Sequence, residues 1–162
     1  MFNHSNKTAL VTGASRGIGK EISSILAENG IKVIGVATSE KSLESISNID
    51  NIIPLACDIS DEQSVENLYT SIKEHSESID ILVNNAGIHM DNILLRMDTK
   101  EWEKVLDVNL NGPFYLTRLL LKDMIKNKKG RIVNISSISG TDGNKGQSNY
   151  SASKGGLLAF TK

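Results

Sequence analysis

The stretch TALVTGASRGIGKEI, residues 8–22, joins a short apolar run to a helical pattern through three glycines. Residues 8–12 are mostly apolar or β-branched and predict a strand. Beyond the glycines, isoleucines recur at helical spacing until Asn29-Gly30, a typical helix end. A helix that begins directly after such a turn presents free amide groups and a positive dipole to an anion. The stretch therefore predicts a strand, a binding turn and a helix.

Four further apolar runs follow, and helical patterns separate them. Their residues are apolar almost without interruption, which is typical of strands buried on both faces of a parallel sheet. Ser60 or Asp61 is expected to cap one intervening helix, and Gly112-Pro113 to bend another that begins near Thr99. Alternating strands and helices predict an α/β fold with a doubly wound parallel sheet and ligands at the carboxyl ends of its strands. The four runs span residues 32–37, 51–56, 80–85 and 131–136.

Composition narrows the class of protein. The chain has 162 residues, of which 23% are charged, and a net charge of −1. We expect a single domain over residues 1–162, with no nucleic acid or membrane surface as a partner. No apolar run reaches the roughly 20 residues of a membrane span and no leader pattern opens the chain, so we expect a cytoplasmic protein. Cys57 is expected in the core, and His4, His75 and His89 lack metal-ligand spacing, so we expect no metal site.

The glycine turn predicts a dinucleotide site. TGASRGIG (12–19) has the spacing G-x-x-x-G-x-G rather than G-x-G-x-x-G, and a purely structural turn is the alternative. The second strand ends in VATSEK (36–41), without an acidic residue at the place where NAD-binding units hold the ribose. Arg16 is instead suited to a 2′-phosphate, with Thr38 beside it, so we expect NADPH/NADP as the cofactor. The alternatives are a solvated Arg16 and a Glu40 that caps the next helix.

Polar residues follow the later runs, at the edge where ligands are expected. Asp58 suits an adenine amino group or a helix or turn cap equally well. Asn84 and Asn85 suit either the cleft or ordinary turn chemistry. Asn109 lies just before Gly112-Pro113, where its amide either fills hydrogen bonds that the bend opens or holds a water.

Tyr150 and Lys154 stand four residues apart and share one face of the last helical pattern. A phenol has an ordinary pKa of about 10 and transfers protons poorly at neutral pH, whereas a nearby ammonium favours its ionised form. Ser137 follows the fifth run and is expected to stabilise charge on a reacting carbonyl oxygen. With a hydride from the cofactor, these three side chains predict the reduction of a carbonyl group.

Five segments together resemble the short-chain dehydrogenase/reductase family: TGASRGIG, NNAG, VNLNG, NISSISG and YSASK. The resemblance covers residues 7–162 and implies a nicotinamide-dependent oxidoreductase with a catalytic set of Asn109, Ser137, Tyr150 and Lys154. By this resemblance, Tyr150 would be the acid during reduction, and Lys154 would lower its pKa and hold the nicotinamide ribose. Ser137 would orient the substrate carbonyl, and Asn109 would hold a water that relays protons to Lys154.

The same resemblance implies a cofactor site built from the glycine turn and the ends of three strands. In this site the turn lines the phosphates, Asp58 meets the adenine, and residues 85–87 flank the adenosine ribose. The implied cofactor-binding residues are Gly13, Ser15, Arg16, Gly17, Ile18, Gly19, Thr38, Asp58, Ile59, Asn85, Ala86, Gly87, Tyr150 and Lys154.

Within the family, the chain is most similar to the reductases that act on 3-oxoacyl thioesters of acyl carrier protein in bacterial fatty acid biosynthesis. Segments 91–97, 101–114 and 143–162 carry this similarity, whereas His89 and Met90 stand where relatives commonly carry threonine and arginine. The similarity implies NADPH-dependent reduction to the (R)-3-hydroxyacyl thioester by a homotetramer. The alternatives are an acetoacetyl-CoA reductase, another short-chain ketone or alcohol oxidoreductase, and a non-catalytic dinucleotide-binding module.

Members of this family continue through further strands beyond the segment that resembles the end of this chain. We therefore expect a domain that is incomplete at its C-terminus, with the last strands missing. We also expect the 162-residue chain alone to bind NADPH weakly and to reduce little. The fifth run, residues 131–136, would then form an exposed apolar sheet edge.

Overall fold

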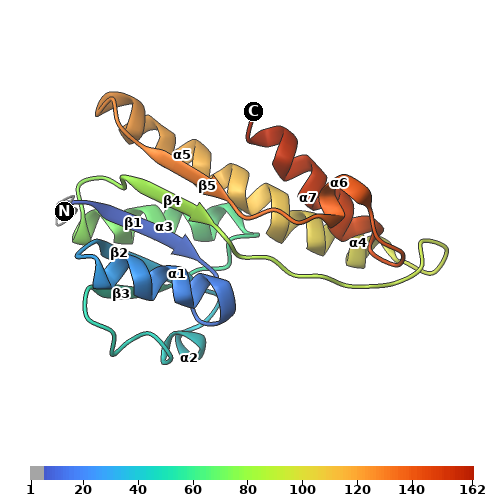
Figure 1. Ribbon diagram of the computed structural model, residues 1–162, viewed down its shortest axis with the longest axis horizontal. Helices are drawn as coiled ribbons and strands as arrows, with labels where there is room; N and C mark the ends of the chain where they lie inside the picture. Colours follow the sequence, from blue (N-terminus) through green and yellow to red (C-terminus); the bar gives the residue numbers. More distant parts are fainter. Residues whose placement is uncertain (1–5) are drawn as a thin grey trace.

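The computed structural model describes residues 6–162 and shows one five-stranded parallel sheet with helices on both faces (Figure 1). The strands lie in the order β3-β2-β1-β4-β5, and every neighbouring pair is parallel. This order confirms the predicted doubly wound α/β fold, because the chain reverses its direction across the sheet between β3 and β4. The strands are β1 Thr8–Thr12, β2 Lys32–Ala37, β3 Ile52–Ala56, β4 Ile81–Asn84 and β5 Arg131–Asn134.

Helices make the connections between the strands. A π-helical segment, Asp107–Asn111, separates α4 from α5, and two further helices, α6 and α7, follow β5. Figure 1 shows α4 and α7 beyond the end of the sheet toward which the β4–α4 connection runs, whereas α5 lies along β5. The helices are α1 Gly17–Glu28, α2 Glu40–Leu43, α3 Glu62–His75, α4 Thr99–Leu106, α5 Gly112–Lys126, α6 Ser139–Asp142 and α7 Ser148–Phe160.

Strand side chains point alternately into two cores, one on each face of the sheet. On one face, Leu10, Ile34 and Leu82 pack with apolar side chains of α3 and α5. On the other face, Val11 and Val33 pack with side chains of α1 and α2. Burial on both faces explains why the strand sequences are continuously apolar rather than alternating. It also fixes the carboxyl ends of β1, β2 and β4 at one edge, where the site lies.

Short polar side chains set where the helices begin. Asp61, one of the two predicted caps, is the N-cap of α3, and its carboxylate accepts two backbone N–H groups. The suggestion that Glu40 caps α2 is wrong, because the hydroxyl of Ser39 accepts from the backbone N–H of Ser42. A serine before the helix reaches the free amides of the first turn, whereas Glu40 already lies within that turn.

The predicted irregularity at Gly112-Pro113 takes the form of the π-helical segment directly before it. Pro113 lies in the first turn of α5, where its missing N–H group leaves no hydrogen bond unmade. Insertions of this kind are common at functional sites. Here the segment carries Asn109, whose side chain is fully buried.

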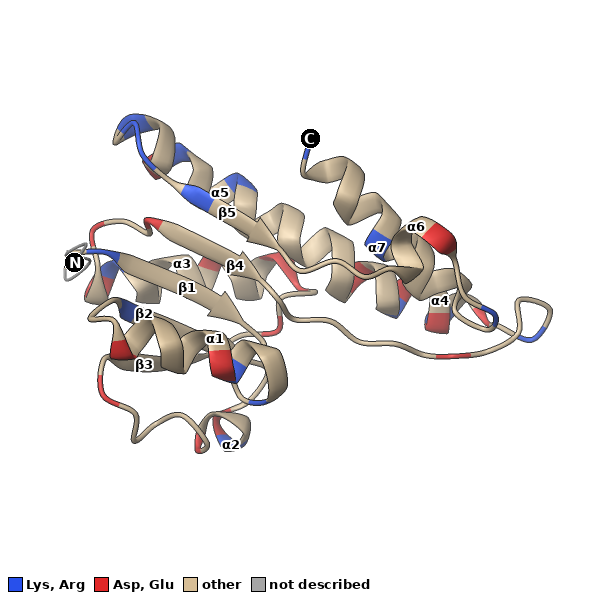
Figure 2. Ribbon diagram, in the orientation of Figure 1, with Lys and Arg blue, Asp and Glu red and all other residues tan. Residues whose placement is uncertain are grey.

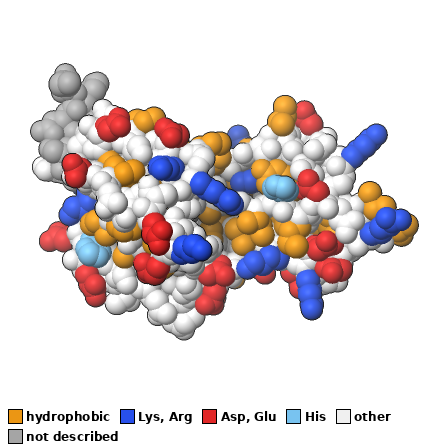
Figure 3. Space-filling view, turned by 90° about the horizontal axis from the view of Figure 1, so that it is seen from below, with side chains coloured by type: hydrophobic (Ala, Val, Ile, Leu, Met, Phe, Trp, Pro, Cys, Tyr) orange, Lys and Arg blue, Asp and Glu red, His pale blue; other side chains and the backbone are white. Residues whose placement is uncertain are grey.

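Surface charge gathers away from the ligand edge. Basic side chains surround the turn between α5 and β5 (Figure 2), at the amino end of β5 and therefore opposite the carboxyl ends of the strands. Apolar side chains remain exposed over the half of the molecule that holds α4 (Figure 3), among them Leu94 and Leu95. Within residues 6–162, no helix combines the length and apolarity needed to cross a bilayer, and no cluster of ligating side chains suits a metal ion. His4 lies outside the described residues.

Thr12 joins the ends of β1 and β4. Its side chain is buried, and its hydroxyl oxygen accepts from the backbone N–H groups of Asn85 and Ala86, each at 3.0 Å. The same hydroxyl donates to the carbonyl oxygen of Val83 at 3.4 Å. One side chain therefore satisfies the backbone where β4 stops pairing and the chain turns into the site.

Replacement of Thr12 by valine keeps the shape but removes the hydroxyl. We expect T12V to lower the free energy of unfolding by about 1–3 kcal/mol for each N–H group left without a partner. The measurement is urea unfolding of T12V beside T12S, which keeps the hydroxyl and should remain much closer to the parent. A T12V protein as stable as T12S would contradict this role.

Candidate active site

A cleft of about 780 Å³ opens where β1, β2 and β4 end. Its lining contains every residue of the glycine turn and the strand ends that the resemblance assigns to the cofactor: Gly13, Ser15, Arg16, Gly17, Ile18, Gly19, Thr38, Asp58, Ile59, Asn85, Ala86 and Gly87. Sequence reasoning did not assign several other lining residues to the cleft, namely Val36, Ala37, Ser42, Ser45, Cys57, Ile88, Lys104 and Val108. Most of these line the cleft because they neighbour a predicted residue, but Lys104 comes from α4 and has no local sequence signal.

The glycine turn has the shape of a phosphate cradle. Gly19 packs its Cα against the carbonyl oxygen of Gly13, so that no side chain fits between helix and turn. Gly13 and Gly17 have φ angles of +66° and +53°, and a Cβ on Gly17 would meet nothing within 4 Å. The start of α1 is therefore bare backbone beside open space, which fits the pyrophosphate of a dinucleotide.

The cleft near β2 carries hydroxyls rather than acids. Arg16 is exposed at the N-cap of α1, and Thr38 follows the last residue of β2. Among the described residues that line the cleft, Asp58 carries the only carboxylate. The end of β2 therefore carries a guanidinium and small hydroxyls beside it. An acidic residue at this place would instead favour a cofactor whose ribose has no 2′-phosphate.

Asp58 is held in a turn after β3. Its Oδ1 accepts from the hydroxyl of Ser60 at 2.6 Å and from the backbone N–H of Ser60 at 3.0 Å. The Nζ of Lys104 lies 3.8 Å from Oδ2 and donates to the Ser60 hydroxyl at 3.0 Å. The hydrogen bond from Ser60 and, to a smaller extent, the charge of Lys104 lower the pKa of Asp58. The turn role predicted for Asp58 is therefore present and uses Oδ1. Asp58 also lines the cleft, where its Oδ2 lies near Lys104.

The two asparagines that end β4 have different surroundings. The Nδ2 of Asn85 donates to the carbonyl oxygen of Thr12 at 2.8 Å, and Asn85 lines the cleft. Asn84 is buried, and its Nδ2 donates to Asn134 at 2.8 Å. Only Asn85 thus belongs to the cleft, because successive residues of a strand point to opposite faces.

Lys154 is a buried cation. Its side chain is 3% exposed, and Nζ donates to the carbonyl oxygen of Ile135 at 2.7 Å. Burial lowers the pKa of Lys154 below its ordinary value of 10.5. Nζ lies 5.9 Å from the centroid of the Tyr150 ring and 3.4 Å from the place a Cβ on Gly87 would take. The ammonium therefore stands between the tyrosine and the rim of the cleft.

Asn109 anchors the chain after β4. Its Oδ1 accepts from the backbone N–H of Ile88 at 2.8 Å, and its Nδ2 donates to the carbonyl oxygen of Ile88 and to the hydroxyl of Ser153. The idea that this amide fills hydrogen bonds opened in its own helix is therefore wrong, because the partners lie elsewhere. Both of its side-chain N–H groups have protein partners, and the relay water at Asn109 stays a prediction.

Ser137 follows β5 and has one recorded partner. Its Oγ accepts from the backbone N–H of Ser139 at 3.2 Å. A hydroxyl that accepts through its oxygen keeps its own hydrogen free to donate. Ser136, the preceding residue, donates instead to the carbonyl oxygen of Lys154 at 3.0 Å.

Comparison with known proteins identifies the family. Residues 7–162 match the family described as short chain dehydrogenase. This chain belongs to the short-chain dehydrogenase family. The family accounts for the parallel sheet, the glycine turn and the nearby tyrosine and lysine, and it makes the protein an oxidoreductase.

Three named relatives are 3-oxoacyl-[acyl-carrier-protein] reductases FabG. The protein of Vibrio cholerae is 48% identical, and that of Escherichia coli 46%, each over 99% of this chain and 67% of the relative. The protein of Haemophilus influenzae is 46% identical over 96% of this chain and 65% of the relative. The chain spans about two thirds of the length of these relatives.

The buried ammonium of Lys154 makes the free energy of unfolding depend on pH. The unfolded chain holds the Lys154 proton to a higher pH than the folded chain, because burial lowers the folded pKa below 10.5. Stability contributed at this position therefore rises with pH between the lowered value and 10.5. We expect the parent to gain stability relative to K154M as pH rises through this window.

Urea unfolding of both proteins at several pH values measures this difference. K145M, which removes a lysine from an exposed position, is the matched control. A difference between parent and K154M that stays constant with pH would contradict the burial argument.

Proposed function

We propose that the protein reduces a 3-oxoacyl thioester of acyl carrier protein to the (R)-3-hydroxyacyl thioester with NADPH. The observation that carries this proposal is identity of 46–48% over 99% of the chain to reductases of that name. The pairing of Tyr150 with Lys154 supports it, because the ammonium lies 5.9 Å from the tyrosine ring centroid and 3.4 Å from the place that a Cβ on the cleft residue Gly87 would take.

Each of these side chains has a task in the proposed reaction. Tyr150 gives its phenolic proton to the carbonyl oxygen as that oxygen becomes an alkoxide. Ser137 donates its free hydroxyl hydrogen to the same oxygen and stabilises the developing charge. Lys154, held by the carbonyl oxygen of Ile135, keeps a positive charge beside the phenol as the proton leaves. Asn109 fixes the backbone of Ile88, which lines the cleft.

The cofactor is proposed to be NADPH, which supplies the hydride when bound. The bare start of α1 at Gly17 and Gly19 would hold the pyrophosphate, and Asp58 would accept from the adenine amino group. Arg16 would pair with the 2′-phosphate, and Thr38 would donate to it. Gly87 would leave room for the nicotinamide ribose near Lys154, since a side chain there would crowd Nζ.

The acyl carrier and the assembly belong to the same proposal. His89 and Met90 are exposed on the β4–α4 connection, where relatives commonly carry a basic residue, so a thioester of CoA remains the alternative substrate. Phe114 of α5 and Phe160 of α7 meet edge to face with ring centroids 6.5 Å apart, and they are 40% and 39% exposed. This apolar surface supports assembly into the homotetramer expected of the complete protein.

The activity test compares thioesters on acyl carrier protein and on CoA with simple ketones, using the complete product of the gene. We expect NADPH oxidation with the thioesters, fastest on acyl carrier protein. We expect Y150F to lower kcat by at least about 100-fold, because the proton donor is lost. Y115F, which alters a tyrosine of α5, should keep the parental rate. NADPH binding without turnover of any carbonyl compound would favour the non-catalytic module.

The cofactor choice is tested at the glycine turn. We expect R16A to raise the Kd for NADPH by about 10-fold and to leave the Kd for NADH nearly unchanged, because only the 2′-phosphate contact is lost. K20A removes the same charge one helical turn later, outside the cleft lining, and should change neither Kd. Equal losses for both cofactors in R16A would contradict a 2′-phosphate contact.

A further inference from the structure

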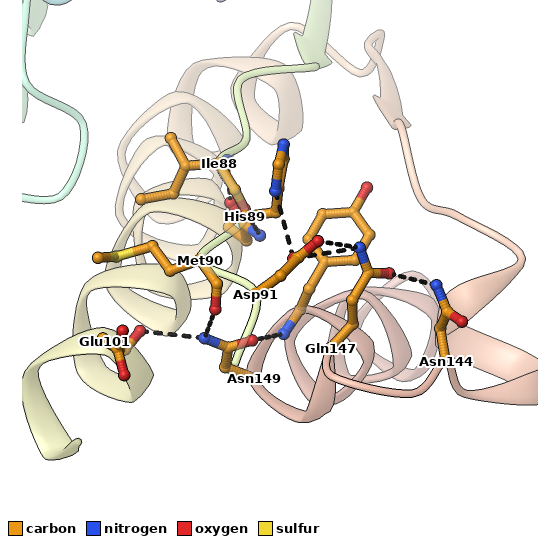
Figure 4. Close-up of polar contacts among 10 residues, drawn as sticks. Ile88, His89, Met90, Asp91, Glu101, Asn144, Gln147 and Asn149 are labelled. Carbon is orange, nitrogen blue, oxygen red and sulfur yellow. Dashed lines mark hydrogen bonds and ion pairs between the residues drawn. The ribbon is translucent and has the colours of Figure 1, made fainter. Parts of the chain in front are cut away.

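The connection from β4 to α4 lies against the first turn of α7, which carries Tyr150 (Figure 4). Residues 85–92 of this connection have no regular secondary structure. Their backbone polar groups therefore need partners from outside the segment. Figure 4 shows Asn149 bonded to the backbone of Met90 and Gln147 bonded to the side chain of Asp91.

Asn149 makes the central link. Its side chain is 0% exposed, and its Oδ1 accepts from the backbone N–H of Tyr150 at 2.8 Å. Its Nδ2 donates to the carbonyl oxygen of Met90 at 2.9 Å and to that of Glu101 at 3.2 Å (Figure 4). One buried amide thus joins the connection, α4 and the start of α7, and both of its N–H groups are used.

A second, outer link runs parallel to the first. The Nε2 of Gln147 donates to both carboxylate oxygens of Asp91, at 3.0 and 3.2 Å. The backbone N–H of Asn92 donates to the carbonyl oxygen of Gly146 at 2.8 Å. These contacts are more exposed than that of Asn149, so water competes for them and they hold the connection less firmly.

The other end of the Tyr150 backbone is held as well. The hydroxyl of Ser153 donates to the carbonyl oxygen of Tyr150 at 2.8 Å and accepts from Asn109 at 3.0 Å. Asn109 in turn holds both backbone groups of Ile88, which lines the cleft. Tyr150 is therefore fixed at its N–H by Asn149 and at its carbonyl by Ser153, and both links lead to the same connection.

We propose that Asn149 is a positioning residue for Tyr150, which sets the phenol relative to the segment Ile88–Met90 at the cleft rim. This inference rests on the proposed function, in which Tyr150 is the acid. Gln147, the N-cap of α7, makes no side-chain hydrogen bond to the helix, so Asn149 does not duplicate a side-chain cap that already exists. Its two N–H groups reach other elements, which a cap alone does not require.

Two substitutions separate capping from positioning. N149A removes every contact of the amide. N149D keeps an oxygen that accepts from Tyr150 but places a carboxylate oxygen against the carbonyl oxygens of Met90 and Glu101, which repel it. S148A is the matched control, because Ser148 precedes Asn149 in the same helical turn and its side chain has no recorded partner among the described residues.

The first measurement is steady-state kinetics together with cofactor binding, on the complete gene product. We expect N149A and N149D to lower kcat by about 10- to 100-fold, because a misplacement of the order of 1 Å is enough for such a loss. The Kd for NADPH should change by less than about twofold, since the glycine turn is untouched. S148A should match the parent. Parental kcat in N149D would overturn the inference, because only the links to other elements are lost in it.

The second measurement is hydrogen exchange of the backbone amides, which needs no turnover. We expect faster exchange at Tyr150 in N149A but not in N149D, and faster exchange at Ile88 in both. Unchanged exchange at both positions in N149A would overturn the inference whatever the reaction. A parent protein that binds NADPH but reduces no carbonyl compound would refute only the proposed function. The hydrogen-exchange rates would then still show whether Asn149 links Tyr150 to the β4–α4 connection.

Discussion

The backbone where β4 ends is partly buried and no longer paired to a neighbouring strand, and the rest of the site depends on how it finds hydrogen-bond partners. Thr12 supplies one oxygen to two N–H groups at this point, and Asn85 returns a hydrogen bond to the end of β1. These contacts keep two parallel strand ends together after their ladder has stopped. The edge can then open into a cleft while the backbone N–H groups of Asn85 and Ala86 stay paired.

The same requirement shapes the second half of the site. The connection after β4 has no ladder of its own, so side-chain amides take over the task that a neighbouring strand performs elsewhere in the sheet. Asn109 comes from the π-helical segment and Asn149 from α7, and both are fully buried. Buried amides tolerate little displacement, because a lost partner costs the full desolvation of the group. The connection is thereby ordered relative to Tyr150 without regular structure.

The features that the sequence predicts well are those with a local cause. The five strands and the glycine turn follow from runs of adjacent residues, and Asp61 caps α3 because the cap lies next to the amides it serves. Features that depend on distant partners could not be predicted. Asn149, Ser153 and Lys104 look like ordinary polar helix residues until the fold brings Met90, Asn109 and Asp58 to them. The sequence leaves Asn84 open between the cleft and a turn, because the direction of its side chain depends on strand register.

The fold buries the ammonium of Lys154, although burial of a charge is unfavourable. α6 packs so closely on α7 that a Cβ on Gly140 would lie 2.7 Å from the backbone carbon of Lys154, and this packing removes water from the residue. The ammonium keeps one strong acceptor, the carbonyl oxygen of Ile135, which lies directly after β5. A carbonyl dipole satisfies one N–H group but does not neutralise the charge, so the cation stays poorly compensated. Tyr150, whose ring centroid lies 5.9 Å from this charge, has its backbone held at both ends. In the proposed reaction the amide links and the poorly compensated cation act together, because a charge directs a proton only when its neighbour has a fixed position.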